Sequence, residues 1–195
     1  MLGYESFPPA FRRYLIAVSF LGPVVAVTIG VVFWADWSTR QGFLAALLTI
    51  LGILAERYAL QLTHHTRTSV NTAVYVAMLL ILPWSSVGVL AGLSIAIAEL
   101  LRQHSRRTRD LPELLFNAGQ GALYVTAGAA GYGLLDGRWP EPAVGGLGSA
   151  VALVGGMVLM HLVNTGLVAV PGAMQSNATP LRVWRTTLFL DLLPL

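Results

Sequence analysis

The sequence predicts an all-α fold, a polytopic bundle of membrane-spanning helices, from three observations. The 195-residue chain is 55% hydrophobic but only 11% charged, whereas a soluble domain has roughly 25% charged residues. Several apolar runs are about 20 residues long, the length that spans the roughly 30 Å hydrocarbon layer of a bilayer. These runs lack the alternation of a strand, so helices rather than barrel strands satisfy the backbone polar groups. We predict six full transmembrane helices and a partial seventh, in a single integral membrane domain.

Charge and cysteine content exclude several classes of protein. All 12 basic residues are arginine, and the net charge is +3. In a membrane protein such a balance indicates arginines at the cytoplasmic rim, near anionic lipid headgroups, rather than a nucleic-acid partner. The chain has no cysteine, which excludes disulfides and thiolate metal sites.

The first two spans come after a polar lead, residues 1–13, which ends in an arginine pair. The first span covers 14–34. It is too long for the apolar region of a signal peptide and no cleavage site comes after it, so we predict a retained helix. Small residues at Gly22, Ala26 and Gly30 give it a flat face for a neighbouring helix. The second span covers 42–60 and leads to a polar loop.

The third and fourth spans are short. They cover 69–82 and 87–101, and the turn between them consists of Pro83 and residues 84–86. Fifteen residues make a helix of about 22 Å, less than a full crossing. Tilted helices in a thinned bilayer, or a re-entrant hairpin, would fit that length. We favour two short helices packed inside a compact bundle.

The second half of the chain holds two long spans and a remnant. The fifth span covers 112–135 and the sixth covers 143–170, where Pro171 and Gly172 are expected to end it. Residues 171–185 then form a cytoplasmic linker, and the bundle as a whole covers 14–170. The last apolar run, 186–195, is about 15 Å long as a helix and too short to span. We expect it to be a truncated helix that packs poorly.

Arginine bias sets the orientation. If the N-terminus is cytoplasmic, ten arginines lie inside, and only Arg40 and Arg138 lie outside. The chain is therefore expected to be a multi-pass membrane protein with its N-terminus in the cytoplasm. Four arginines in and before the loop between spans four and five are expected to contact lipid headgroups: Arg102, Arg106, Arg107 and Arg109.

Two carboxylates, Glu56 and Glu99, lie near the inner ends of spans two and four. An ionisable side chain inside a membrane is costly and is a functional candidate by default. Alternatively, both lie close enough to the interface to reach the headgroups, or to pair with Arg57 or Arg102.

Polar residues also mark spans five and six. Asn117 and Gln120 share a helix face that Tyr124 continues, and His161 and Asn164 form a similar pair. Such amides often join neighbouring helices by hydrogen bonds. The predicted orientation places them at the depth of the carboxylates. We therefore predict a polar cluster inside the bundle, open to the cytoplasm, with a carboxylate near an amide. The candidate ligand-binding or coupling residues are Glu56, Glu99, Asn117, Gln120, Tyr124, His161 and Asn164.

A short phrase recurs in the apolar sequence. It reads VNTA from Val70, FNAG from Phe116 and VNTG from Val163, at spacings of 46 and 47 residues. Matches this short are close to chance, and we infer no duplication from them. If real, they would indicate repeated helical hairpins.

No catalytic or cofactor-binding constellation is present in the sequence. There is no HExxH, GxSxG, P-loop or dinucleotide-binding motif. Adjacent histidines at His64 and His65 do not face one site on a regular element, and no ligand triad has zinc spacing. We therefore predict a protein that is not an enzyme and that holds no metal or cofactor.

Several features of the sequence occur together: the Ala-Glu pair ending span two, the short spans joined at a proline turn, and the phrases AELLR, LFNAGQ, HLVNTGLVA and PLRVWR. They resemble the N-terminal multi-helix membrane region of bacterial HD-GYP and GGDEF signalling proteins, over about residues 42–190. The resemblance implies a protein of the bacterial cytoplasmic (inner) membrane. In that family the membrane region is a sensory module that precedes a cytoplasmic phosphodiesterase or cyclase domain. No HD-GYP or GGDEF residues exist here, so an output enzyme is absent, supplied by another chain, or lost by truncation.

Two functions therefore compete. The chain is expected to be an integral membrane sensory or input module. Its expected partners are a cytoplasmic output domain, a partner subunit, or a second copy of the chain in a homodimer. The alternative is a small-molecule transporter, or the substrate-binding membrane subunit of one, since compact helices around a polar pocket would suit it. An intramembrane enzyme is the least favoured hypothesis.

Overall fold

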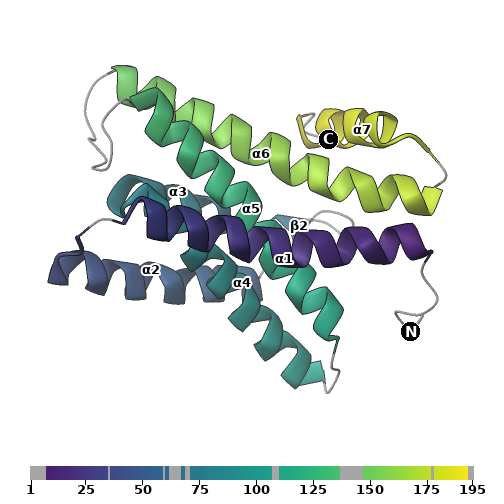
Figure 1. Ribbon diagram of the computed structural model, residues 1–195, viewed down its shortest axis with the longest axis horizontal. Helices are drawn as coiled ribbons and strands as arrows, with labels where there is room; N and C mark the ends of the chain where they lie inside the picture. The colour runs from purple at the N-terminus through teal and green to yellow at the C-terminus, as the bar shows by residue number, and fades with distance from the viewer. Residues whose placement is uncertain are drawn as a thin grey trace.

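The computed structural model describes residues 8–34, 36–58, 60–61, 67–68, 71–106, 110–136, 147–176 and 178–192. These residues form seven helices and one small antiparallel pair of strands, β1 (Leu60–Gln61) and β2 (Arg67–Thr68) (Figure 1). The helices are α1 (Pro9–Val32), α2 (Thr39–Arg57), α3 (Asn71–Ile81), α4 (Trp84–Arg106), α5 (Leu111–Asp136), α6 (Leu147–Ser176) and α7 (Pro180–Leu192). The predicted all-α class is confirmed, apart from this two-residue pairing.

Within the described residues, four helices are long and apolar enough to cross a membrane: α1, α2, α4 and α6. The protein is therefore a helical membrane protein, with fewer such helices than the six full spans predicted. Helix α3 has 11 residues and a length of about 16 Å, half a bilayer core. Helix α5 has 26 residues, but its amides and five glycines reduce its hydropathy.

Helix α5 is at the centre of the bundle, where it contacts α1, α3, α4 and α6. In Figure 1, α1, α2 and α6 run roughly along one direction, and α4 and α5 cross them obliquely. Helix α7 lies beside α6 on the outside. The α4–α5 hairpin thus provides the surfaces on which α1, α2 and α6 pack.

Glycines allow the closest contacts with α5. A Cβ atom at Gly22 would overlap the carbonyl of Gly119, and one at Gly119 would lie 2.5 Å from the Val18 carbonyl oxygen. A Cβ atom at Gly92 of α4 would similarly lie 3.0 Å from the Ala122 methyl group. The small face predicted for α1 is therefore used in part, since Gly22 and Ala26 are buried against the bundle.

An apolar core occupies the middle of the bundle, between α2, α3, α4, α5 and α6. Its largest fully buried side chains are Tyr75, Met78, Leu79, Leu82, Val87 and Val125. Ile95 belongs to this core and also lines the polar cavity described below. Along α4, the residues of the apolar core therefore come before Ile95, and the charged residues Glu99 and Arg102 come after it.

The structure corrects the predicted fourth span. Helix α4 begins at Trp84 and has 23 residues, so residues 84–86 are its first turn rather than a loop. Pro83 precedes the helix and its carbonyl accepts from the Ser86 amide at 2.9 Å. At the other end, Arg102 and Gln103 bond back to Glu99, which extends the helix through residues that the sequence assigned to a loop.

The predicted end of the sixth span is also wrong, because α6 continues through Pro171 to Ser176. A proline inside a helix leaves the carbonyl four residues earlier without its amide partner. Here that carbonyl belongs to Leu167, and the Tyr14 hydroxyl of α1 donates to it at 2.6 Å. The lost backbone bond is replaced by a tertiary one, so the helix is not ended.

Residues 171–185 are consequently not a linker. Helix α7 begins at Pro180, a favoured first helical position, after Thr179, whose carbonyl accepts from the amides of Arg182 and Val183. The first half of α7 packs on α6 through Trp184. The side chains from 187 onward, on which the expectation of poor packing for 186–195 depends, lie outside the described residues.

Candidate ligand-binding site

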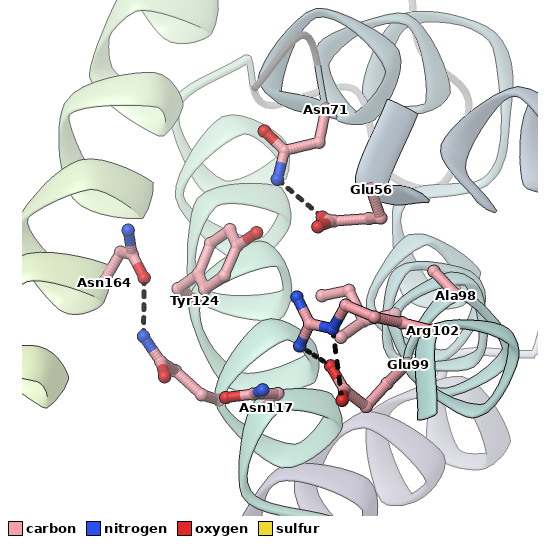
Figure 2. Close-up of a pocket in the computed structure, with 10 residues that line it drawn as sticks. Glu56, Asn71, Ala98, Glu99, Arg102, Asn117, Tyr124 and Asn164 are labelled. Atoms are coloured by element: carbon pink, nitrogen blue, oxygen red, sulfur yellow. Dashed lines mark hydrogen bonds and ion pairs between the residues drawn. The ribbon is translucent and has the colours of Figure 1, made fainter. Parts of the chain in front are cut away.

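A polar cavity of about 210 Å³ lies where α2, α3, α4, α5 and α6 meet (Figure 2). The residues around it carry two carboxylates, one guanidinium and four amides. They are Glu56, Asn71, Ile95, Ala98, Glu99, Arg102, Asn117, Gln120, Tyr124 and Asn164. Five helices therefore contribute to one hydrophilic space within an apolar bundle.

Glu56, one residue before the end of α2, is held by α3. Its Oε1 accepts from Asn71 Nδ2 at 2.5 Å and from the Tyr75 hydroxyl at 2.8 Å. Asn71 begins α3 and Tyr75 lies one turn later, so both donors face the same carboxylate. Among the described residues no cation pairs with Glu56. The guanidinium of neighbouring Arg57 instead donates to Ser105 Oγ at 3.2 Å.

Glu99 is buried in α4, with 4% of its surface exposed. It is ion-paired with Arg102, one turn further along the same helix, and accepts from Gln103 Nε2 at 3.2 Å. Arg102 also lies 3.6 Å from Glu113 of α5. The guanidinium thus bridges two carboxylates on two helices, which compensates the cost of burying Glu99.

Gln103 closes the turn between α4 and α5. Its Nε2 donates to the Asp110 carbonyl at 2.8 Å, and its Oε1 accepts from the Asp110 amide at 3.0 Å. The Asp110 carboxylate then caps α5 by accepting from the Glu113 amide. These bonds fix the ends of both helices beside the cavity.

On the opposite wall, Gln120 of α5 donates to Asn164 Oδ1 of α6 at 2.9 Å. The next residue, Thr165, accepts a hydrogen bond at 2.9 Å from the indole of Trp184 in α7. Figure 2 shows the Tyr124 ring between Asn164 on one side and Glu56 on the other. A continuous set of contacts therefore leads from the cavity to the last helix.

A groove of about 650 Å³ adjoins the cavity along α6. It shares Asn71, Tyr124 and Asn164 with the cavity. Its other lining residues are mostly apolar: Thr72, Val154, Met157, Val158, Met160, His161 and Leu162. The two spaces differ in chemistry but have a common wall.

The structure brings six of the seven predicted site residues to the cavity: Glu56, Glu99, Asn117, Gln120, Tyr124 and Asn164. His161 lines the groove instead, one turn from Asn164. The two carboxylates line the same cavity as Asn117 and Gln120. Among the described residues, the hydrogen bonds of the carboxylates go to donors on α3 and α4 rather than to these amides.

The arginines expected at the lipid headgroups divide into two groups. Arg102 lines the cavity with its guanidinium on Glu99, so its first contact is a carboxylate of the protein rather than lipid phosphate. The side chain of Arg106, and the whole of Arg107 and Arg109, lie outside the described residues.

Sequence reasoning missed Asn71 and Tyr75, the two residues that hold Glu56. Both lie in an apolar segment. An asparagine at the start of such a segment indicates the start of a helix, and a tyrosine within it indicates a core residue. The recurring phrase was the available signal, because its three asparagines, Asn71, Asn117 and Asn164, all line the cavity. Their common placement gives these matches a structural meaning that their length alone does not.

No three histidine, aspartate or glutamate side chains in the described part of the chain are grouped to hold a metal ion. The site is instead a set of hydrogen-bond donors and acceptors with two carboxylates and one guanidinium. No protein-family model matches this chain, and neither the curated proteins nor the solved structures contain a significant match to it.

Proposed function

We propose that the protein is a membrane-embedded input module, which binds a small ligand in the polar cavity and transmits the binding to α7. The single observation that carries the proposal is the hydrogen-bond route from the cavity to the last helix. Gln120 bonds Asn164 across the cavity wall, and the adjacent Thr165 bonds Trp184 of α7.

A ligand that competes for the side-chain amide of Gln120 or Asn164 would act on α6 at Asn164. Asn164 and Thr165 are consecutive residues, so a shift that frees Asn164 also moves the acceptor of Trp184. Coupling between sites requires an element that both of them bias. The α6–α7 contact is the proposed element, and α7 is the proposed output.

The orientation is inferred from the arginines. With the N-terminus in the cytoplasm, α2 and α4 end on the cytoplasmic side and α5 begins there, which makes the cavity open toward the cytoplasm. In this arrangement α5 also crosses the bilayer, shielded by the helices around it, and α3 enters only part of it. The inner membrane of a bacterium, with its anionic headgroups, would suit the arginine-rich side.

The closed far side of the bundle favours sensing over transport. Beyond Ile95, the space between α3, α4 and α5 is filled by fully buried Met78, Val87 and Val125. A transport path would have to separate α4 from α5 where a Cβ at Gly92 would lie 3.0 Å from the Ala122 methyl group. Closely packed interiors of this kind resist gradual opening.

The resemblance to signalling proteins suggests a receiver for the signal from α7. A cytoplasmic output domain, whether continuous with this chain or on a partner subunit, would respond to the displacement of α7. The proposed module therefore needs no catalytic residues of its own.

The test uses the protein in lipid nanodiscs and a panel of amines, amino acids, sugars and nucleotides. We expect at least one compound to raise the midpoint of thermal unfolding and to change the emission of Trp184, measured as the difference from the Trp184→Phe protein. Thr165→Val should keep the binding and lose the emission change. Gln120→Leu should weaken the binding itself.

Proteoliposomes distinguish the alternative. The compound that binds should not accumulate inside vesicles that contain the protein. Accumulation against an empty-vesicle control would identify a transporter, and binding that survives Gln120→Leu and Glu56→Gln would place the ligand elsewhere.

A further inference from the structure

We propose that the cavity and its adjoining groove form one amphipathic site, which takes a single-chain amphiphile with a cationic amine or ammonium head. This inference rests on the proposed function, since it names the ligand class of the same site. The carboxylate of Glu56, which has no cation beside it among the described residues, indicates a positive head. Apolar surface along α6 indicates the tail. The guanidinium of Arg102 is already engaged by two carboxylates, which disfavours a phosphate and therefore a phospholipid.

The positive head is indicated by the charges around the cavity. The charged side chains that line it are Glu56, Glu99 and Arg102, two negative groups and one positive. Arg102 is engaged by Glu99 and by Glu113. Glu56 has only the neutral donors Asn71 and Tyr75 among the described residues. A cation beside Glu56 would complete a charge-assisted hydrogen bond at a partly buried carboxylate, and such bonds are stronger than those between neutral groups.

The aromatic ring of Tyr124, which lines the cavity, favours an amine or ammonium group over a metal ion. It is held edge to face against the buried Tyr75 ring, with the two ring centroids 6.4 Å apart, and Tyr75 in turn donates to Glu56. Ring faces attract organic cations, and carboxylate–aromatic combinations are a common way to bind alkylammonium groups. The side-chain amides of Asn117 and Gln120 add oxygens that can accept from an N–H donor.

The apolar tail is indicated by the apolar groove, which is continuous with the polar cavity. Asn71, Tyr124 and Asn164 line both spaces, so a molecule anchored at Glu56 can pass the Tyr124 ring into the groove. There Val154, Met157 and Val158 of α6 offer apolar surface. Methionine side chains adapt to flexible apolar ligands. The groove volume of about 650 Å³ exceeds that of the cavity, about 210 Å³, which matches a small head and a larger tail.

The charge also argues against a phospholipid. An amine-bearing phospholipid would place its phosphate close to its ammonium group, beside Glu56 and Glu99. The single guanidinium, Arg102, is already shared between Glu99 and Glu113. A like-charged phosphate would therefore be repelled, whereas an amphiphile whose only charge is positive would not.

Native mass spectrometry of the protein in detergent tests the proposal, because it counts bound small molecules by mass. Dodecylamine is the probe; dodecanol has the same tail without the charge, and propylamine has the head without the tail. We expect dodecylamine to bind about tenfold more tightly than either, a difference typical of losing one charged or apolar anchor. Equal binding of dodecanol, or retention of phosphatidylethanolamine at the same site, would overturn the proposal.

Three variants locate the probe. Glu56→Gln should weaken dodecylamine about tenfold, whereas the matched control Asp36→Asn, at an exposed carboxylate that lines neither the cavity nor the groove, should leave it unchanged. Val158→Trp should fill the groove and weaken dodecylamine without altering the cavity. This third variant keeps the test decisive if Glu56→Gln lowers folding yield. Full binding to both Glu56→Gln and Val158→Trp would exclude the site.

The outcome separates this inference from the proposed function. If dodecylamine fails to bind but a small polar compound changes Trp184 emission, the ligand class is wrong and the input module stands. If dodecylamine binds through Glu56 but leaves Trp184 emission unchanged, the amphipathic site stands and the coupling to α7 is wrong.

Discussion

At the scale of single residues, Gly22 is the position where α1 approaches α5 most closely. A Cβ there would overlap the Gly119 carbonyl, so Gly22→Ala has to push two backbones apart. We expect it to lower the free energy of unfolding by about 1–3 kcal/mol, the usual cost of overpacking. Denaturant titration in micelles, monitored by circular dichroism, measures this.

Gly42→Ala is the matched control. A Cβ at Gly42 meets no atom within 4 Å, and alanine favours a helix over glycine by up to about 1 kcal/mol. This variant should be as stable as the wild type or slightly more so. Equal losses in the two variants would mean that the close α1–α5 contact does not support the fold.

Tyr75 has a second testable role. It is fully buried and its hydroxyl is one of the two donors to Glu56. Tyr75→Phe keeps the ring and removes that donor, which should cost about 1.5–3 kcal/mol for a hydrogen bond to a charged group. Tyr58→Phe, at a side chain with 67% exposure, should cost almost nothing. A Tyr75→Phe protein as stable as the Tyr58→Phe protein would show that Glu56 does not depend on Tyr75.

Which residues are polar in an apolar span can be found from the sequence, but their partners cannot. The costs of burying Glu56, Glu99, Asn117 and Gln120 predicted that they face inward, and they do. Their bonds depend on helix rotation and on neighbours from other segments. Thus Glu56 is bound by two residues of α3, which no periodicity within α2 could indicate.

At the scale of helices, the α6–α7 contact includes a side-chain hydrogen bond between Trp184 and Thr165. Thr165 donates to the His161 carbonyl at 2.8 Å within α6 and accepts from Trp184 at 2.9 Å. In a double-mutant cycle, Trp184→Phe and Thr165→Val should show a coupling energy of about 0.5–1.5 kcal/mol. Hydrogen exchange of the α7 amides should rise in either variant.

Controls for this cycle lie in the same helices. Thr186→Val removes a hydroxyl that, among the described residues, donates within α7 to the Arg182 carbonyl, and it should show no coupling to Thr165. Thr165→Ser keeps the acceptor and should restore slow exchange. A strictly additive Trp184–Thr165 pair would mean that α7 is held by other contacts.

Helix boundaries show where local signals are overridden by tertiary structure. Pro171 looks like a helix end, but the carbonyl that proline leaves unpaired, that of Leu167, is satisfied by the Tyr14 hydroxyl, 153 residues away in the sequence. Likewise, Arg102 and Gln103 resemble loop residues until their bonds to Glu99 and Asp110 are known. Both errors come from long-range or side-chain bonds that a linear pattern does not contain.

At the scale of the whole molecule, composition was enough to predict a helical membrane protein, but not its helix lengths. The apolar runs of α1, α2 and α6 were found close to their true positions. The central helix α5 carries amides and glycines because it is surrounded by other helices rather than by lipid. A helix shielded in this way does not need a hydrophobic sequence, so hydropathy alone undercounts the helices of a compact bundle.

The orientation gives the last prediction, and the absence of cysteine makes it easy to test. Single cysteines can be introduced at Asp36, between α1 and α2, at His104, near the end of α4, and at Thr179, between α6 and α7; all three positions are exposed. Because arginines collect in cytoplasmic loops, Asp36→Cys should react with a membrane-impermeant maleimide in intact cells. His104→Cys and Thr179→Cys should react only after the cells are permeabilised. These two positions lie at the ends of different helices, so together they test whether α4 and α6 both run inward, as a cavity that opens toward the cytoplasm would require. The reverse labelling pattern would place the cavity on the outer side, and labelling of His104→Cys and Thr179→Cys on opposite sides would show that one helix between them does not cross.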